Sequence, residues 1–173
     1  MDENNFKTDN IKDNYDTMLL MLRGQISDEK NIIINLCNAS AIVNAMTDDI
    51  NWTGFYLAED KELLLGPFQG LPACNRIKIG QGVCGTAAST KKVMRIDNVH
   101  EFKGHIACDG ASNSEIVVPI VIDEKLLGVL DIDSPTVGRF GKLEQEYFEK
   151  FVDILLECNW KNLRGEIYGD IKA

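Results

Sequence analysis

Cys108 and His105 lie in a polar segment from Gly104 to Glu115, which reads GHIACDGASNSE. An apolar, β-branched run, IVVPIVI, follows at once from Ile116 to Ile122 and predicts a buried strand. Cys108 is therefore expected on a loop that is anchored by a rigid strand, which is how reactive side chains are commonly presented. His105 precedes Cys108 by three residues and could help to stabilise a thiolate there.

A second group of candidate residues follows from pairing this strand with the next apolar run, Leu126 to Ile132. An antiparallel hairpin with residues 123–125 as its turn places Glu115 opposite Asp133. Asp131 falls on the same face as Asp133, since side chains alternate along a strand. Same-face neighbours on a strand lie about 6.5 to 7 Å apart, so the three carboxylates would form a cluster. Such a cluster binds a cation, shares a proton or is solvated at the end of the sheet.

Thiols and carboxylates in one site favour a specific redox reaction. The sulfur of a sulfoxide becomes electrophilic when its oxygen is protonated or accepts a hydrogen bond, and a thiolate can then attack it. The thioether leaves, the attacking sulfur becomes a sulfenic acid, and a second thiol converts the sulfenic acid to a disulfide. Glu115 or Asp133, with a pKa raised by the neighbouring charges, could supply the proton.

The composition of the whole chain limits the fold, the ligand and the compartment. The 173 residues, 45% of them hydrophobic, suffice for one domain with one sizeable core. A net charge of −9 disfavours nucleic acid and anionic membranes, so we expect a small cationic or zwitterionic ligand. The polar N-terminus lacks the apolar core of a signal peptide, and the five cysteines do not have the spacing of a secreted disulfide framework. We therefore expect a cytoplasmic protein whose cysteines begin as thiols.

The hydrophobic patterns predict an α+β fold in which an antiparallel sheet is backed by helices. Residues 1–14 are expected to be a flexible N-terminus, and residues 15–173 to form a single domain. Helices are predicted over 16–25, from about 27 or 28 onward, over about 83–89 and over 142–157. Strands are predicted over 51–57, 63–68, 93–97, 116–122 and 126–132, whereas the glycines and proline of 70–82 predict irregular backbone. The segments that carry Cys74, Cys84 and Cys108 would cover the other face of the sheet.

The remaining cysteines and two aromatic residues have less specific interpretations. Cys37 belongs to the apolar stretch of the second predicted helix, and we expect it to fill the core as a small hydrophobic residue. Cys158, which follows the last predicted helix, is assigned no role. Trp52 and Tyr56 are four residues apart on a predicted strand and therefore on one side of it, where aromatic side chains commonly fill a core.

Five strings of the sequence together resemble the free methionine-(R)-sulfoxide reductases, which are single GAF domains of cytosolic proteins. They are NWTGFYL, LLLGPFQGLPAC, GQGVCGTAAST, GHIACDGASNSEIVVP and LGVLDIDSPTVGRF, in the family's order between Asn51 and Phe140. The resemblance implies a GAF-like antiparallel sheet with N- and C-terminal helices on one face and active-site loops on the other. It also implies an enzyme, a thiol-dependent L-methionine (R)-S-oxide reductase.

The resemblance assigns a role to each candidate side chain. Three cysteines match the family's nucleophile, its resolving partner and an auxiliary thiol, in the order Cys108, Cys84 and Cys74. Three carboxylates and two aromatic residues of this chain match the substrate pocket of the family. They are Glu115, Asp131, Asp133, Trp52 and Tyr56. A thioredoxin-like reductant would regenerate the thiols. A homodimer stays an open prediction, because the N-terminal helices and the tail from Gly165 to Ala173 diverge from the family.

Two other functions fit the same residues less completely. GAF domains generally resemble small-molecule sensors, so a ligand-binding or redox-sensing domain without turnover is the main alternative. A metal site could combine the loop cysteines with His100 or His105. The spacings lack the paired C-x-x-C knuckles of structural zinc, so no metal or other cofactor is predicted.

Overall fold

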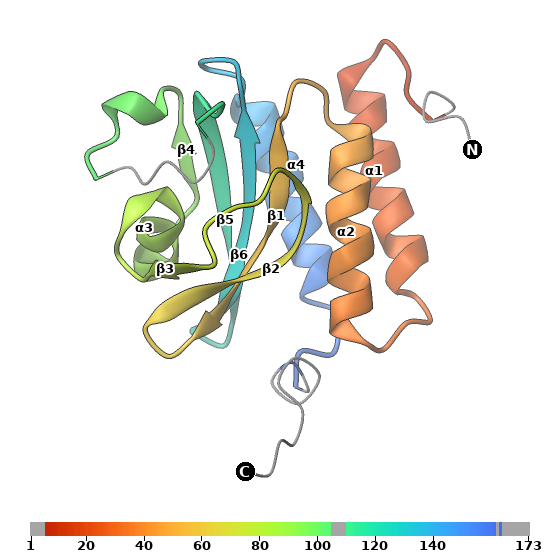
Figure 1. The fold of residues 1–173 in the computed structure, drawn as a ribbon. Helices are drawn as coiled ribbons and strands as arrows, with labels where there is room; N and C mark the ends of the chain where they lie inside the picture. The colour runs from red at the N-terminus through yellow and green to blue at the C-terminus, as the bar shows by residue number, and fades with distance from the viewer. Residues whose placement is uncertain (1–5, 105–109, 162, 164–173) are drawn as a thin grey trace.

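The structure is a computed structural model that describes residues 6–104, 110–161 and 163 (Figure 1). Its centre is a six-stranded antiparallel sheet with the strand order β3-β2-β1-β6-β5-β4. The strands are β1 Trp52–Glu59, β2 Glu62–Gly70, β3 Arg76–Lys78, β4 Met94–Ile96, β5 Ser114–Ile122 and β6 Lys125–Ser134. The helices are α1 Ile11–Ile26, α2 Ile32–Met46, α3 Gly82–Thr90 and α4 Lys142–Leu155, with a 3-10 turn, η2, at Val99–Glu101. The predicted α+β fold is confirmed.

Helices α1, α2 and α4 cover one face of the sheet, and α3 lies against the other (Figure 1). Alternation along the strands produces this division, because neighbouring residues of one strand point to opposite faces. On β5, Ile116 and Val118 pack with the three long helices, whereas Val117 between them packs with α3. The two hydrophobic clusters therefore share the sheet as a common wall. No helix in the described part of the chain is long and apolar enough to cross a bilayer.

Two helix boundaries differ from the prediction because asparagine side chains cap the helices elsewhere. α1 begins at Ile11, inside the segment that was expected to be flexible, since the Asn10 side chain accepts a hydrogen bond from the backbone N–H of Lys12. α2 begins at Ile32 and not near residue 27 or 28, because the Asn31 side chain accepts from the backbone N–H of Ile34. The division into residues 1–14 and 15–173 stays a prediction.

Cys37 and the segment before α3 also depart from the prediction. Cys37 is exposed, because the buried face of α2 runs through Leu36, Ala39 and Val43 and leaves Cys37 at its margin. The segment 70–82 was predicted to be irregular, yet it contains the three-residue strand β3. Its central residue, Ile77, is buried and pairs with Leu63 of β2. A strand this short carries too little alternation to be recognised from sequence.

The β5–β6 hairpin reaches the predicted register by a different route. Its turn has two residues, Asp123 and Glu124, and not three, because Ile122 pairs with Lys125. Both turn residues have positive φ angles, 48° and 62°, as the tight type I′ hairpin turn requires. This turn alone would shift the pairing by one residue, but a bulge that leaves Leu127 unpaired restores it. The pairing of Glu115 with Asp133 is therefore as predicted.

Candidate active site

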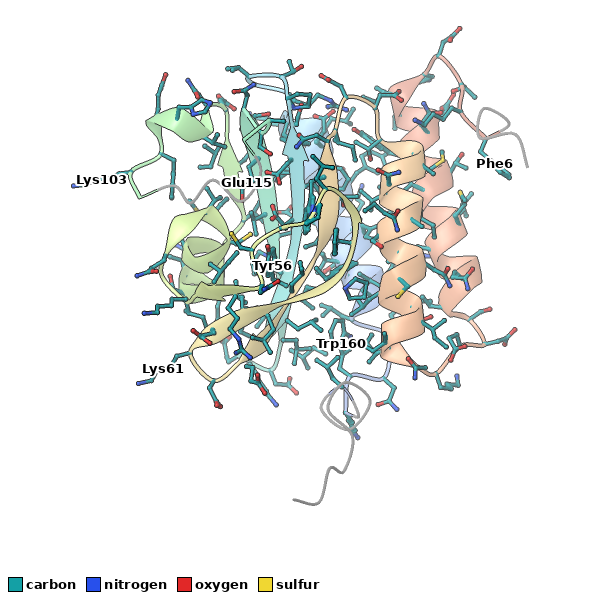
Figure 2. The ribbon with its side chains drawn as sticks, in the orientation of Figure 1. Phe6, Tyr56, Lys61, Lys103, Glu115 and Trp160 are labelled. Atoms are coloured by element: carbon teal, nitrogen blue, oxygen red, sulfur yellow. The ribbon has the colours of Figure 1, made fainter. Side chains whose placement is uncertain are left out.

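Strands β1, β6 and β5 place the candidate side chains in rows on the face of the sheet that α3 covers. Trp52 pairs with Asp133, which pairs on its other side with Glu115. One row further along, Gly54 pairs with Asp131. Directly paired residues share a face, so three acidic residues and one indole ring face the same space. Figure 2 shows Tyr56 and Glu115 on the α3 side of the sheet, away from α1 and α2.

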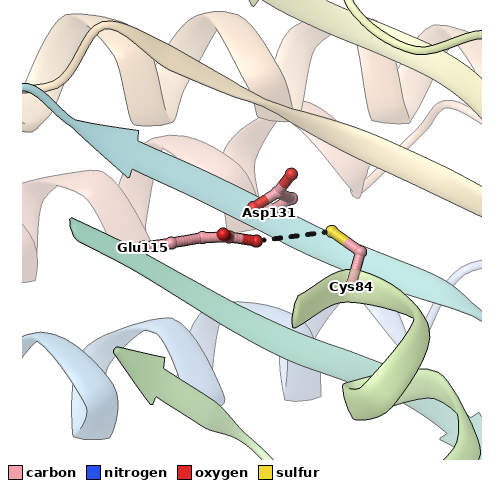
Figure 3. Close-up of side chains that lie close together, drawn as sticks. All are labelled: Cys84, Glu115 and Asp131. Carbon is pink, nitrogen blue, oxygen red and sulfur yellow. Dashed lines mark hydrogen bonds between the residues drawn. The ribbon is translucent and has the colours of Figure 1, made fainter. Parts of the chain in front are cut away.

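Helix α3 adds a thiol to this group of carboxylates. Cys84 lies in its first turn and is buried, as are Glu115 and Asp131 (Figure 3). The Cys84 thiol donates a hydrogen bond to Oε1 of Glu115, with 3.7 Å between sulfur and oxygen. One ligand atom from each of Cys84, Glu115 and Asp131 lies within 4.8 Å of the other two. Two strands and a helix thus bring together three groups that the sequence separates widely.

Burial determines the protonation of this cluster. It raises the pKa of Glu115 well above its usual range, and the nearby Asp131 and Asp133 raise it further. Burial also raises the pKa of Asp131, to about 6, and that of the Cys84 thiol, which the two carboxylates disfavour as a thiolate. Neither Glu115 nor Asp131 forms a salt bridge with a basic side chain of the described residues. Burial and the neighbouring carboxylates therefore favour the neutral thiol of Cys84 and the protonated form of Glu115.

Three aromatic rings form a wall beside the carboxylates. The rings of Trp52 and Tyr56 stack with their centroids 5.9 Å apart, and Trp52 stacks on Phe68 of β2 at 5.4 Å. Gly54 makes this packing possible, because a Cβ atom there would lie 2.4 Å from the Cβ of Phe68 and 2.8 Å from the Trp52 ring. Phe68 was not among the candidate residues. Its place in the string LLLGPFQGLPAC, one of the five that resemble the family, was the available signal.

Comparisons with known proteins agree with this geometry. The sequence profile of the GAF domain matches residues 26–155. The Escherichia coli protein named free methionine-R-sulfoxide reductase is 51% identical over 148 residues, which are 83% of this chain and 90% of the relative. The chain belongs to the free methionine-R-sulfoxide reductase family of GAF domains.

Two further relatives extend across most of the chain. Protein YtsP of Bacillus subtilis is 52% identical over 143 residues, which are 82% of this chain and 88% of that protein. A solved structure of the free methionine-R-sulfoxide reductase of Neisseria meningitidis in complex with its substrate superposes with a TM-score of 0.84 at 35% identity, covering 87% of this chain and 91% of that one. The likeness thus includes both the fold and the segments that carry the site.

The structure gives the family's cysteine positions different states in this chain. Cys74 is half-buried and disulfide-bonded, whereas Cys84 is a free thiol. Cys108, matched to the family's nucleophile, and His105 lie outside the described residues. His100 is exposed, and its Nε2 lies 2.8 Å from the side-chain oxygen of Asn113.

The aromatic wall of this family member is also attached to the segment that carries Cys74. The indole N–H of Trp52 donates to the backbone carbonyl of Leu71 at 3.1 Å, and the Tyr56 hydroxyl donates to the carbonyl of Cys74 at 3.0 Å. Segment 71–74 has no regular secondary structure of its own, so these two bonds tie it to β1. Two rings of the aromatic wall therefore help to hold the segment that carries Cys74.

Proposed function

We propose that the chain reduces free methionine-R-sulfoxide to methionine. The observation that carries this proposal is the buried cluster of Glu115, Asp131 and Cys84 beneath an aromatic wall, in a member of a family whose relatives are named for this activity. The enzyme would be an oxidoreductase that acts on sulfur and uses thiols as its electron source.

The pocket supplies two kinds of interaction that a free amino-acid sulfoxide needs. An ionised carboxylate, Asp131 or Asp133, accepts hydrogen bonds from the α-ammonium group and neutralises its charge. Glu115, whose pKa burial raises, stays protonated and donates its proton to the sulfoxide oxygen as the sulfur is attacked. The stacked rings of Trp52 and Phe68 provide an apolar surface for the thioether methyl group.

We assign Cys108 as the nucleophile, in keeping with its match to the family. The Cys108 thiolate attacks the sulfoxide sulfur and forms an S–S bond while Glu115 protonates the oxygen. The hydroxyl group then transfers to the Cys108 sulfur as the S–O and S–S bonds of the substrate sulfur break, which gives a sulfenic acid and methionine. Cys84 is unsuited to this step, because a buried neutral thiol beside two carboxylates is a poor nucleophile.

For the second thiol we favour Cys74 over Cys84, which the family resemblance puts first. The disulfide-bonded state of Cys74 and the free, buried state of Cys84 support this choice. Attack of the Cys74 thiol on the sulfenic acid forms a disulfide and releases water. A dithiol of the thioredoxin type then supplies two electrons and two protons and restores both thiols.

The proposal also includes a cellular compartment and an oligomeric state. A cytoplasmic location provides reducing equivalents for the disulfide. The chain would act alone or as a homodimer, with residues 15–173 as one catalytic domain.

A turnover assay tests the proposed function. The reduced protein, incubated with free methionine-R-sulfoxide and excess dithiothreitol, should form methionine over many cycles, whereas the S epimer should remain unchanged. Binding of the sulfoxide without formation of methionine would instead establish a sensor domain.

A further inference from the structure

We propose that Cys84, Glu115 and Asp131 form a binding site for one thiophilic divalent cation, with Zn²⁺ as the reference ion. Occupation of this site would block the pocket, so the cation would act as a reversible inhibitor. The cation site itself is inferred from the three side chains and holds whether or not the chain turns over methionine sulfoxide.

The positions of the three ligand atoms suit a tetrahedral ion. Cysteine sulfur and carboxylate oxygen bind Zn²⁺ at about 2.3 Å and 2.0 to 2.2 Å, which places neighbouring S and O ligands about 3.5 Å apart. The Cys84 sulfur already lies 3.7 Å from Oε1 of Glu115, and all three atoms lie within 4.8 Å of one another. Small side-chain rotations would close the remaining difference, and water would complete the coordination.

An unpaired acceptor in the cluster points independently to a ligand. Among the residues that the structure describes, the Oδ1 atom of Asp131 has no hydrogen-bond partner, and the residue is only 6% exposed. Leaving a buried acceptor unpaired is destabilising, and more so for a charged group. A carboxylate oxygen of Asp131 lies within 4.8 Å of the Cys84 sulfur and of a Glu115 oxygen (Figure 3), so a cation bound between them would give the Asp131 carboxylate a partner.

The sulfur distinguishes a metal ion from an ammonium group as the occupant. Both occupants suit two carboxylates, but a thiol is a weak acceptor for N–H donors and, once deprotonated, a strong ligand for Zn²⁺. Binding would release the Cys84 thiol proton and the carboxyl proton of the cluster to solvent. Mg²⁺ and Ca²⁺ prefer oxygen ligands in larger numbers, so the site should discriminate against them.

Titration of the phosphine-reduced protein with Co²⁺ tests the proposal, because thiolate coordination gives a charge-transfer band in the near ultraviolet. We expect one Co²⁺ per chain, displacement by Zn²⁺ and no displacement by Mg²⁺. Cys84→Ser should abolish the band, and Asp131→Asn should weaken binding by at least the roughly 10- to 100-fold seen when a partner of a metal ligand is removed. Cys37→Ser and Cys158→Ser are matched controls that should keep the band, since both thiols are free but lie outside the cluster.

Two further variants test whether other thiols bind the cation. Cys74→Ser and Cys108→Ser should both retain the band, and loss of it in either would overturn the proposal, as would its persistence in Cys84→Ser. If Cys84→Ser does not fold, the wild-type protein answers the question through protection from alkylation. Zn²⁺ should slow modification of Cys84 by a small thiol reagent, measured by peptide mass spectrometry, and leave Cys37 unaffected. Equal rates at Cys84 with and without Zn²⁺ would contradict the site.

Discussion

The hydroxyl group of Tyr56 donates a hydrogen bond to the backbone carbonyl of Cys74 across 3.0 Å. Burial, with the nearby Asp131 next in importance, raises the pKa of the Tyr56 phenol, so the group remains a donor throughout the neutral range. A residue of the pocket wall thereby holds the backbone of a cysteine that we assign to the disulfide step. In the proposed mechanism, Tyr56 would therefore link substrate binding to the reoxidation step.

Tyr56→Phe should slow regeneration more than reduction. The substitution keeps the ring but removes the bond to Cys74, worth about 0.5 to 1.5 kcal/mol, so the Cys74 segment loses part of its support. We expect a nearly unchanged burst of methionine in the first turnover and a several-fold lower steady-state rate with a thioredoxin-type reductant. Tyr15→Phe is a matched control, because it removes a buried hydroxyl on the opposite face of the sheet. An equal kinetic effect of both variants would show that only stability was lost.

Cys108→Ser should abolish reduction while leaving substrate binding nearly unchanged. A serine hydroxyl does not form the sulfenic acid on which the reaction depends. Methionine formation is measured with excess dithiothreitol, and binding by calorimetry. Full activity of the variant would exclude Cys108 as the nucleophile.

Substitutions of Cys74 and of Cys84 should have different effects in a single-turnover experiment. Cys74→Ser should release one equivalent of methionine and then stall with a thioredoxin-type reductant, because its sulfenic acid lacks the first resolving thiol. Cys84→Ser should continue in steady state. Mass spectrometry of the oxidised wild-type protein should find Cys74 linked to Cys108. A main disulfide that contains Cys84 would reverse this assignment and restore the one expected from the family resemblance.

The stability of the protein should fall as the pH rises through the titration of Asp131. Its pKa is raised from 3.8 to about 6, so the native state binds more protons than the unfolded state between these values. Each unit of raised pKa corresponds to about 1.4 kcal/mol that is lost as the pH increases across this window. Asp131→Asn should flatten the dependence, as measured by urea unfolding between pH 4 and pH 7.

Asp123→Asn serves as the control for that measurement. It changes an exposed aspartate in the hairpin turn, where asparagine also tolerates the positive φ angle. The variant should keep the wild-type slope. A wild-type slope in Asp131→Asn would mean that Asp131 does not titrate as its burial indicates.

The sequence predicted the sheet face of the site better than the turn that builds it. Alternation fixed which residues of β5 and β6 face α3, but Asp123 and Glu124 form a two-residue turn and Leu127 bulges out to compensate. A bulge has no strong local pattern, because it depends on which pairing buries more side chains. The predicted register is therefore correct although it was based on a three-residue turn, because the bulge at Leu127 compensates for the shorter turn.

The contact of Cys84 with Glu115 could not be predicted from the sequence alone. The short helix around it was predicted, yet its contact with Glu115 depends on how α3 packs across the sheet. Gly85 decides that packing, because a Cβ atom there would lie 2.4 Å from the carbonyl oxygen of Lys78 in β3. Strand β3 itself was not predicted, so neither the approach of α3 nor the thiol–carboxylate cluster followed from local patterns. The prediction that Cys37 is buried was wrong for a simpler reason. An apolar stretch of sequence can include residues at the exposed margin of a helix face.

The most direct test of the proposed function compares free methionine-R-sulfoxide with its N-acetyl derivative. In the proposed binding mode the buried carboxylates pair with the α-ammonium group of the substrate, whereas an acetylated nitrogen is neutral and would leave them unpaired. A site that binds a polar group commonly rejects an analogue without it by about 10⁴-fold or more. We therefore predict that kcat/KM for the free amino acid exceeds that for the N-acetyl derivative by this order, and that Asp131→Asn narrows the difference. Similar values of kcat/KM for the two compounds in the wild-type enzyme would contradict the account of the carboxylate pocket.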